Sequence, residues 1–274
     1  DTLVYLSYTT GYRAGGYGLG TLDARSITGA VVNSVYSYDE EEVGHTELGF
    51  KGTFLDGTLQ IFSSLYNYQY DGYQDSVDVY DEVQATFRNI PTNTGSAVNR
   101  GWEVEGTWLA TDELTINANY SLTKTEYQDE IYLLEDDNPL IPEPLFGETS
   151  HLLKGSSLKG IPEHKFTAWA NYRFELENGR LVAAAYYSYT GEYNSNSIDR
   201  EFDKMPARHQ TDASLIWTTP DESLRIRAFV DNLFDARNFR SLSAGGLGNN
   251  YRLTGTLLRP RSFGLDITKT FGEG

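Results

Sequence analysis

A regular alternation of apolar and polar side chains is the feature that most constrains the fold of this chain. It is clearest in residues 114–123. The apolar positions there are Leu114, Ile116, Ala118, Tyr120 and Leu122, and the polar positions are Thr115, Asn117, Asn119, Ser121 and Thr123. Successive side chains of a β-strand point to opposite faces, so this segment is predicted to be a strand with one apolar and one polar face.

About ten such segments follow one another, joined alternately by a tight polar turn and by a long, irregular connection. The predicted strands are residues 3–12, 46–54, 59–70, 100–110, 114–126, 165–176, 181–193, 210–217, 224–231 and 257–271. The predicted short turns are Asp56-Gly57, Thr111-Asp112, Asn178-Gly179 and Pro220-Asp221. Short turns on one side of a sheet and long loops on the other are typical of outer-membrane β-barrels. The fold class is therefore predicted to be all-β, an antiparallel transmembrane β-barrel.

Charged residues keep to one face of most of these strands. Glu103 and Glu105 share one parity, whereas Trp102, Val104 and Trp108 share the other. A basic side chain facing the middle of a bilayer costs about 2–4 kcal/mol, so a charge-free face suits lipid. A soluble barrel also alternates, but aromatic residues near strand ends favour a membrane, where their rings settle at the headgroup level. The parity of 3–12, 59–70 and 181–193 is ambiguous.

Composition sets further limits on the function. The 274 residues show no linker-like division and carry a net charge of −17, which argues against nucleic acid as a partner. Cysteine is absent, and no apolar run is long enough for a transmembrane helix. The chain begins without the basic and apolar regions of a signal peptide, so we expect a mature chain or a fragment.

Several motifs resemble the C-terminal barrel portion of TonB-dependent outer-membrane receptors. They are residues 5–16 (YLSYTTGYRAGG), 47–57 (ELGFKGTFLDG), 101–105 (GWEVE), 231–235 (DNLFD) and 259–271 (RPRSFGLDITKTF). Each motif is degenerate alone, but together they cover most of the chain in family order.

The resemblance implies a barrel of 22 strands around an N-terminal plug. Residues 1–274 are then expected to be about the last ten strands, without the plug, the N-terminal strands or the TonB box. The short turns would face the periplasm, and Phe271 matches the aromatic residue used in outer-membrane assembly, although three residues follow it. The implied location is the outer membrane of a Gram-negative bacterium, with lipid and the TonB complex as partners and no cofactor.

Ligand-binding candidates are aromatic and donor residues near the predicted extracellular strand ends, which suit anionic, planar chelates. They are Arg13, Tyr17, Tyr36, Tyr73, Gln74, Tyr193, Arg200, Arg240 and Tyr251. No catalytic or metal-binding set is predicted. Glu103 and Glu105 are interpreted as wall residues, the acidic run 135–137 as a solvated loop, and the four histidines lack metal-ligand spacing.

The leading functional hypothesis is a non-enzymatic receptor for energy-coupled uptake of a scarce nutrient complex. A ferric siderophore is favoured as cargo, and haem, vitamin B12 and a glycan stay open. A ten-stranded outer-membrane enzyme such as an omptin-like protease is the main alternative, because ten strands can close a barrel. A soluble all-β binding module and a passive porin are the others.

Overall fold

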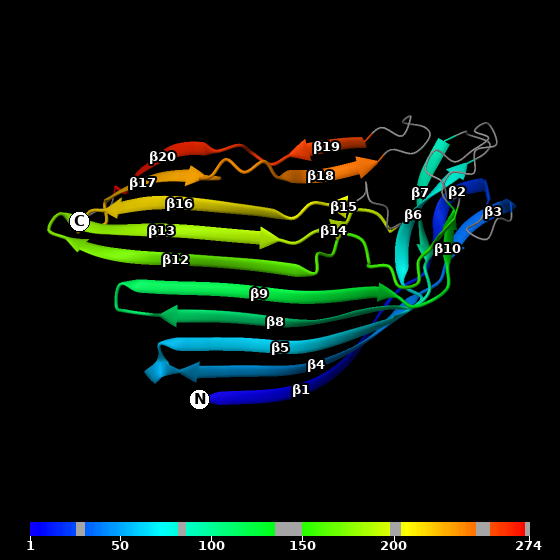
Figure 1. Ribbon diagram of the computed structural model, residues 1–274, viewed down its shortest axis with the longest axis horizontal. Coiled ribbons are helices and arrows are strands. Elements are labelled where there is room, and N and C mark those ends of the chain that lie inside the picture. Colours follow the sequence, from blue (N-terminus) through cyan, green and yellow to red (C-terminus); the bar gives the residue numbers. More distant parts are fainter. Residues whose placement is uncertain (26–30, 82–85, 135–149, 198–203, 245–252, 272–274) are drawn as a thin grey trace.

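A computed structural model of the chain describes residues 1–25, 31–81, 86–134, 150–197, 204–244 and 253–271. Its main feature is one ten-stranded antiparallel sheet, in the order β1-β4-β5-β8-β9-β12-β13-β16-β17-β20. The strands lie side by side in chain order, with tight turns at one end of the sheet and the remaining hairpins at the other (Figure 1). No helix in the described ranges is long and apolar enough to cross a membrane.

The ten strands confirm the predicted series. They are β1 (Thr2–Arg13), β4 (Glu41–Phe54), β5 (Leu59–Asp71), β8 (Ala97–Leu109), β9 (Leu114–Tyr127), β12 (His164–Leu176), β13 (Gly179–Thr190), β16 (Arg208–Thr218), β17 (Leu224–Asp231) and β20 (Ser262–Lys269). The predicted start of the last strand at Leu257 is wrong, because residues 258–261 lie outside any strand. Pro260 falls in this break and has no backbone N–H for a ladder.

The long connections contain strands, so the prediction that they are irregular is wrong for these parts. Residues 153–163 of the longest connection lie outside any strand, as predicted. β2 (Gly16–Arg25), β3 (Val31–Tyr38), β6 (Gln74–Asp81) and β7 (Thr86–Asn93) form a four-stranded sheet in the order β3-β2-β6-β7. Three further pairs are β10 (Tyr132–Leu134) with β11 (Ser150–Leu152), β14 (Tyr193–Asn194) with β15 (Lys204–Met205), and β18 (Phe239–Ala244) with β19 (Leu253–Leu257). The acidic run 135–137 lies outside the described residues.

The register of the sheet separates two faces. In one row, Leu48 faces Leu65, which faces Trp102, and these side chains are 46%, 54% and 39% exposed. In the next row, Ser64 faces Glu103, which faces Ser121. We call the first the apolar face and the second the polar face. Large apolar side chains left this exposed across a whole sheet indicate contact with something other than water.

The turns at the other end of the sheet are short, as predicted, but two differ in detail. The turn after β4 is the 3₁₀ segment Leu55–Gly57, in which Leu55, Asp56 and Gly57 all have positive φ, so it is not the predicted two-residue hairpin. The turn after β12 consists of Glu177 and Asn178 rather than the predicted Asn178-Gly179, because Leu176 pairs with Gly179. The φ of Gly179 is 141°. A Cβ there would lie 2.2 Å from the Thr218 carbonyl oxygen, so the position requires glycine.

The hydrophobic core among the described residues is small and lies at the hairpin end of the sheet. It consists of Ile90, Ala97, Tyr127, Leu153 and Leu158. Ala97 begins β8 and Tyr127 ends β9, whereas the other three belong to β7 and to the segment between β11 and β12. The packed part of this chain therefore anchors the hairpins to the sheet.

Candidate ligand-binding rim

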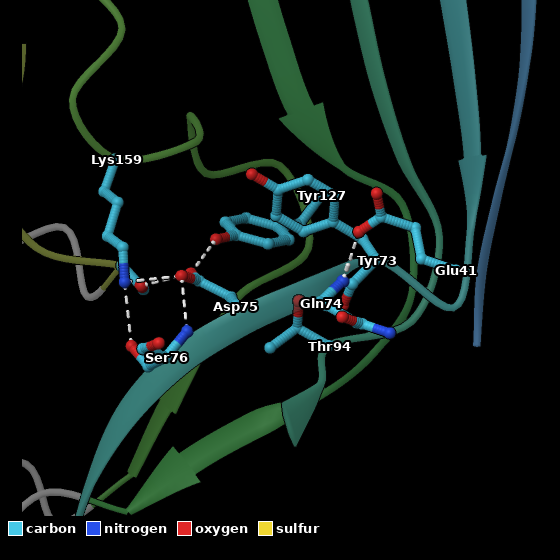
Figure 2. Close-up of polar contacts among 9 residues, drawn as sticks. Glu41, Tyr73, Gln74, Asp75, Ser76, Thr94, Tyr127 and Lys159 are labelled. Carbon is cyan, nitrogen blue, oxygen red and sulfur yellow. Dashed lines mark hydrogen bonds and ion pairs between the residues drawn. The ribbon is translucent and has the colours of Figure 1, made fainter. Parts of the chain in front are cut away.

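A buried carboxylate, Asp75 near the start of β6, joins four segments at the hairpin end. Its side chain is 5% exposed and forms an ion pair with Lys159. Tyr127 donates its hydroxyl to Asp75 Oδ2 over 2.8 Å, and Ser197 Oγ donates to the same oxygen over 2.5 Å. Lys159 Nζ also donates to the Ser76 carbonyl over 2.8 Å (Figure 2). We call Asp75, Tyr127, Lys159 and Ser197 the carboxylate hub.

Electrostatics keep the hub carboxylate ionised. Burial favours the neutral acid, but the hydrogen bonds from Lys159 and Ser197, with the charge of Lys159, outweigh it and hold the pKa of Asp75 below its ordinary value. Burial and the neighbouring Asp75 raise the pKa of Tyr127, so that its hydroxyl stays a proton donor. The hub is thus a charged, hydrogen-bonded tie between β6, β9 and the segments that carry Lys159 and Ser197.

Tyr73, a predicted ligand residue, lies beside the hub. Its ring packs edge-on against Tyr127, with centroids 6.1 Å apart, and against Tyr70 at 5.3 Å. Its backbone is fixed on both sides, because Tyr73 N donates to the Gly95 carbonyl over 2.7 Å and Thr94 N donates to the Tyr73 carbonyl over 2.8 Å. Burial, then Asp75, raises the pKa of Tyr73 to about 12, so it is a neutral hydrogen-bond donor.

Gln74 and Arg13, two more predicted residues, meet at the same place. The buried Gln74 amide donates to the carbonyls of Ala14 and Asp39 over 3.1 and 2.8 Å. Gln74 N donates to Glu41 Oε2 over 2.6 Å, and Arg13 is the register partner of Glu41. Both amide hydrogens of Gln74 therefore hold backbone, which makes it a positioning residue beside Arg13 and Tyr73.

A stripe of aromatic side chains leads from this site along the polar face of β5. Tyr66, Tyr68 and Tyr70 share that face, with centroids 5.6 and 6.2 Å apart. His45 of β4 stacks on Tyr68 at 4.0 Å with the rings nearly parallel. The predicted candidates did not include these residues, although tyrosine at every second position of β5 was a visible signal for them.

Three of the other predicted ligand residues lie on strands outside the ten-stranded sheet. Tyr17 on β2 is 78% exposed, Tyr193 on β14 is half-buried, and Arg240 on β18 is exposed. Tyr36 lies in β3, but its side chain is outside the description, as are Arg200 and Tyr251. The structure thus brings together Arg13, Tyr73 and Gln74 of the predicted set.

The polar face continues below this site as a shallow concavity of about 370 Å³. Lys51, Glu103, Glu105 and Lys165 line it. Glu103 and Glu105 face serine and asparagine across β9, so both lie on the wall of the concavity, as the alternation predicted. Within the described ranges, no group of three His, Cys, Asp or Glu residues is arranged to hold a metal ion.

Comparison with known proteins now settles the family. The model for "TonB dependent receptor-like, beta-barrel" matches residues 1–233. The chain belongs to the TonB-dependent receptor family. This confirms the resemblance found in the motifs, and the family's barrel is an outer-membrane structure of Gram-negative bacteria.

Similar proteins extend this result. The ferric-pyoverdine M114 receptor PbuA of Pseudomonas sp. (strain M114) is 24% identical over 227 residues, covering 82% of this chain and 24% of PbuA. The ferric yersiniabactin uptake receptor FyuA of Yersinia pestis superposes with a TM-score of 0.73 at 16% identity, covering 99% of this chain and 35% of FyuA. The siderophore receptor PiuA of Acinetobacter baumannii gives 0.69 at 18% identity, covering 98% and 34%. The chain thus spans a quarter to about a third of these relatives.

Membership of the TonB-dependent receptors assigns the two faces of the sheet. Outer-membrane barrels have an apolar outer wall and a polar lumen wall, so the apolar face corresponds to the outer wall, and the polar face, with the tyrosine stripe and the concavity, corresponds to the lumen wall. Such barrels have short periplasmic turns and longer extracellular connections, so the hairpins are expected on the extracellular side and the tight turns on the periplasmic side. The family comprises receptors and transporters rather than enzymes, so the match favours neither an omptin-like protease nor a soluble binding module.

Proposed function

We propose that residues 1–274 form the C-terminal barrel portion of a receptor that takes up a ferric siderophore by an energy-coupled mechanism. The observation that carries this is that PbuA, FyuA and PiuA, matched by sequence or by structure, are all named as receptors for siderophores or their ferric complexes. The complete receptor would have 22 strands around an N-terminal plug, and the TonB complex would act through the region upstream. The outer wall would contact membrane lipid.

The Arg13–Tyr73 site, which we call the rim, has the chemistry that such a cargo needs. Ferric siderophores are commonly anionic and carry planar chelating groups, which a guanidinium and a neutral tyrosine can both contact. Arg13 supplies the charge, and Tyr73 supplies a ring and a hydroxyl. The backbone of Tyr73 is fixed by hydrogen bonds with Gly95 and Thr94. The hub holds this rim in place, so the cargo would meet a pre-formed surface rather than a loop that must be ordered first. Tyr17, Tyr36, Tyr193, Arg200, Arg240 and Tyr251 remain further candidates.

A binding panel on the purified full-length receptor tests this proposal. Ferric pyoverdine, a ferric catecholate siderophore, haem and vitamin B12 would each be titrated while tryptophan fluorescence is recorded. We expect one of the ferric siderophores to bind, and Arg13→Gln to weaken it roughly tenfold or more, as for loss of one charge-assisted contact. The matched control is Arg180→Gln at the periplasmic end, which should bind normally. Binding of haem or vitamin B12 alone would refute the proposed cargo.

A further inference from the structure

Three exposed arginines lie together where β17 passes into β18 and β19 into β20. We call Arg237, Arg259 and Arg261 the arginine patch. The connection from β17 to β18 and the connection from β19 to β20 lie side by side, because Leu258 N donates to the Asn238 carbonyl over 2.9 Å. These three cations lie in a chain with a net charge of −17, and Asp231 and Asp235 belong to the same turn.

The DNLFD motif builds the turn that carries this patch. Asn232 is buried at φ 55°, and its side chain donates to the carbonyls of Ala236 and Arg259 over 3.0 and 3.2 Å. Asp235 accepts a hydrogen bond from the backbone N of Arg261 over 3.0 Å. Asp235 is thus already engaged by the backbone of the turn, and Arg237 and Arg259 have no carboxylate partner among the described residues.

The patch lies at the extracellular border of the lipid-facing wall. Arg261 is two residues from Phe263, which pairs with Val230 on the apolar face, and its guanidinium lies 5.9 Å from the Phe263 ring centroid. Asn238 donates to the His209 carbonyl over 2.6 Å, which places the turn beside the extracellular end of β16. The exposed side chain of Phe234 is in the same turn. Apolar wall and arginines therefore meet where lipid headgroups begin.

We propose that the arginine patch binds the phosphate groups of a phosphorylated lipid headgroup in the outer leaflet of the membrane. The planar guanidinium presents paired donors that match phosphate geometry, and it does so better than an ammonium group. Exposed basic residues at a membrane surface strengthen binding to anionic lipid about fivefold each. Continuity with the apolar wall selects a membrane lipid rather than a free anion, because acyl chains and headgroup are contacted together.

Native mass spectrometry of the full-length receptor in detergent provides the test. The probe is a bisphosphorylated lipid A, compared with its dephosphorylated form at the same concentrations. The triple variant Arg237→Gln/Arg259→Gln/Arg261→Gln should bind the phosphorylated lipid about a hundredfold more weakly than the wild type. The double variant Arg237→Gln/Arg259→Gln, which spares the hydrogen bond from Arg261 to the Leu233 carbonyl, should lose about 25-fold.

The control changes the same number of arginines at the other end of the barrel, as Arg173→Gln/Arg180→Gln/Arg225→Gln, and should bind as the wild type does. Wild-type receptor should prefer the phosphorylated lipid over the dephosphorylated one, and excess inorganic phosphate should not displace it. The proposal is overturned if the double variant binds like the wild type, if the control loses as much, or if both lipids bind equally well. Displacement by inorganic phosphate would reassign the patch to a free anion.

Discussion

Replacement of Lys159 by methionine tests whether the carboxylate hub holds the extracellular hairpins. Lys159→Met keeps most of the stem but removes the cation beside Asp75. Breaking a fully buried ion pair costs about 3–5 kcal/mol. Here Tyr127 and Ser197 still donate to the carboxylate, and the Lys159 side chain is 35% exposed, so water screens part of the interaction. We therefore expect a loss of about 1–2 kcal/mol in the free energy of local opening.

Hydrogen–deuterium exchange on the full-length receptor in nanodiscs measures this opening directly. A loss of 1–2 kcal/mol corresponds to exchange roughly 5–30 times faster, in peptides from β6 and from the segment around Lys159. Lys154→Met is the matched control, because Lys154 pairs with Glu130 in the same segment, where their side chains are 48% and 70% exposed. An exposed pair contributes little, so exchange should change no more than about twofold.

A second substitution distinguishes the loss of the ion pair from the loss of side-chain packing. Asp75→Asn removes the buried charge, so Lys159→Met should cost less in the Asp75→Asn background than in the wild type. The double variant should also exchange more slowly than Lys159→Met alone, because it no longer leaves the Asp75 charge buried without its cation. Equal effects of Lys159→Met and Lys154→Met, or additive effects of the two hub substitutions, would refute the reasoning.

Three further outcomes are expected. The folded pKa of Asp75 lies below its ordinary value of 3.8, so exchange protection of the hub should be constant above that pH and fall as the pH drops through the folded pKa, and Asp75→Asn should abolish this loss. Leu65→Arg on the lipid-facing wall should cost about 2–4 kcal/mol in urea unfolding of the refolded barrel, whereas Ser64→Arg in the lumen should cost much less. Gly179→Ala should lower barrel stability by about 1–3 kcal/mol in the same assay, whereas Gly106→Ala, with 3.8 Å of clearance, should be near neutral.

The ten strands and their two faces could be predicted because side-chain alternation is a local property of each segment. Trp102 and Glu103 were assigned to opposite walls from parity alone, and the register confirms this. The extracellular hairpins were not predicted, since residues 13–40 were interpreted as a Gly-, Ser- and Tyr-rich connection and the residues before Arg100 as a long polar one. The start of the last strand was predicted wrongly for another reason, because Leu257 continues the apolar pattern across the break at Pro260.

The candidate site was only partly predictable. Arg13, Tyr73 and Gln74 lie near strand ends, so their positions in the sequence suggested the rim. The hub was missed because its members are far apart in the chain: Ser197 follows Asp75 by 122 residues. An isolated aspartate, lysine, tyrosine and serine carry no motif, and only the packing of four segments makes them one network.

Uptake of iron-55 by cells addresses the proposed function most directly. A strain lacking the receptor gene would be supplied with iron-55 bound to the siderophore that the binding panel selects, with and without the full-length gene restored and with and without a working TonB. We predict that accumulation requires both the receptor and TonB, and that Arg13→Gln reduces it while Arg180→Gln does not. Accumulation that is independent of the receptor, or that persists without TonB, would contradict the proposal.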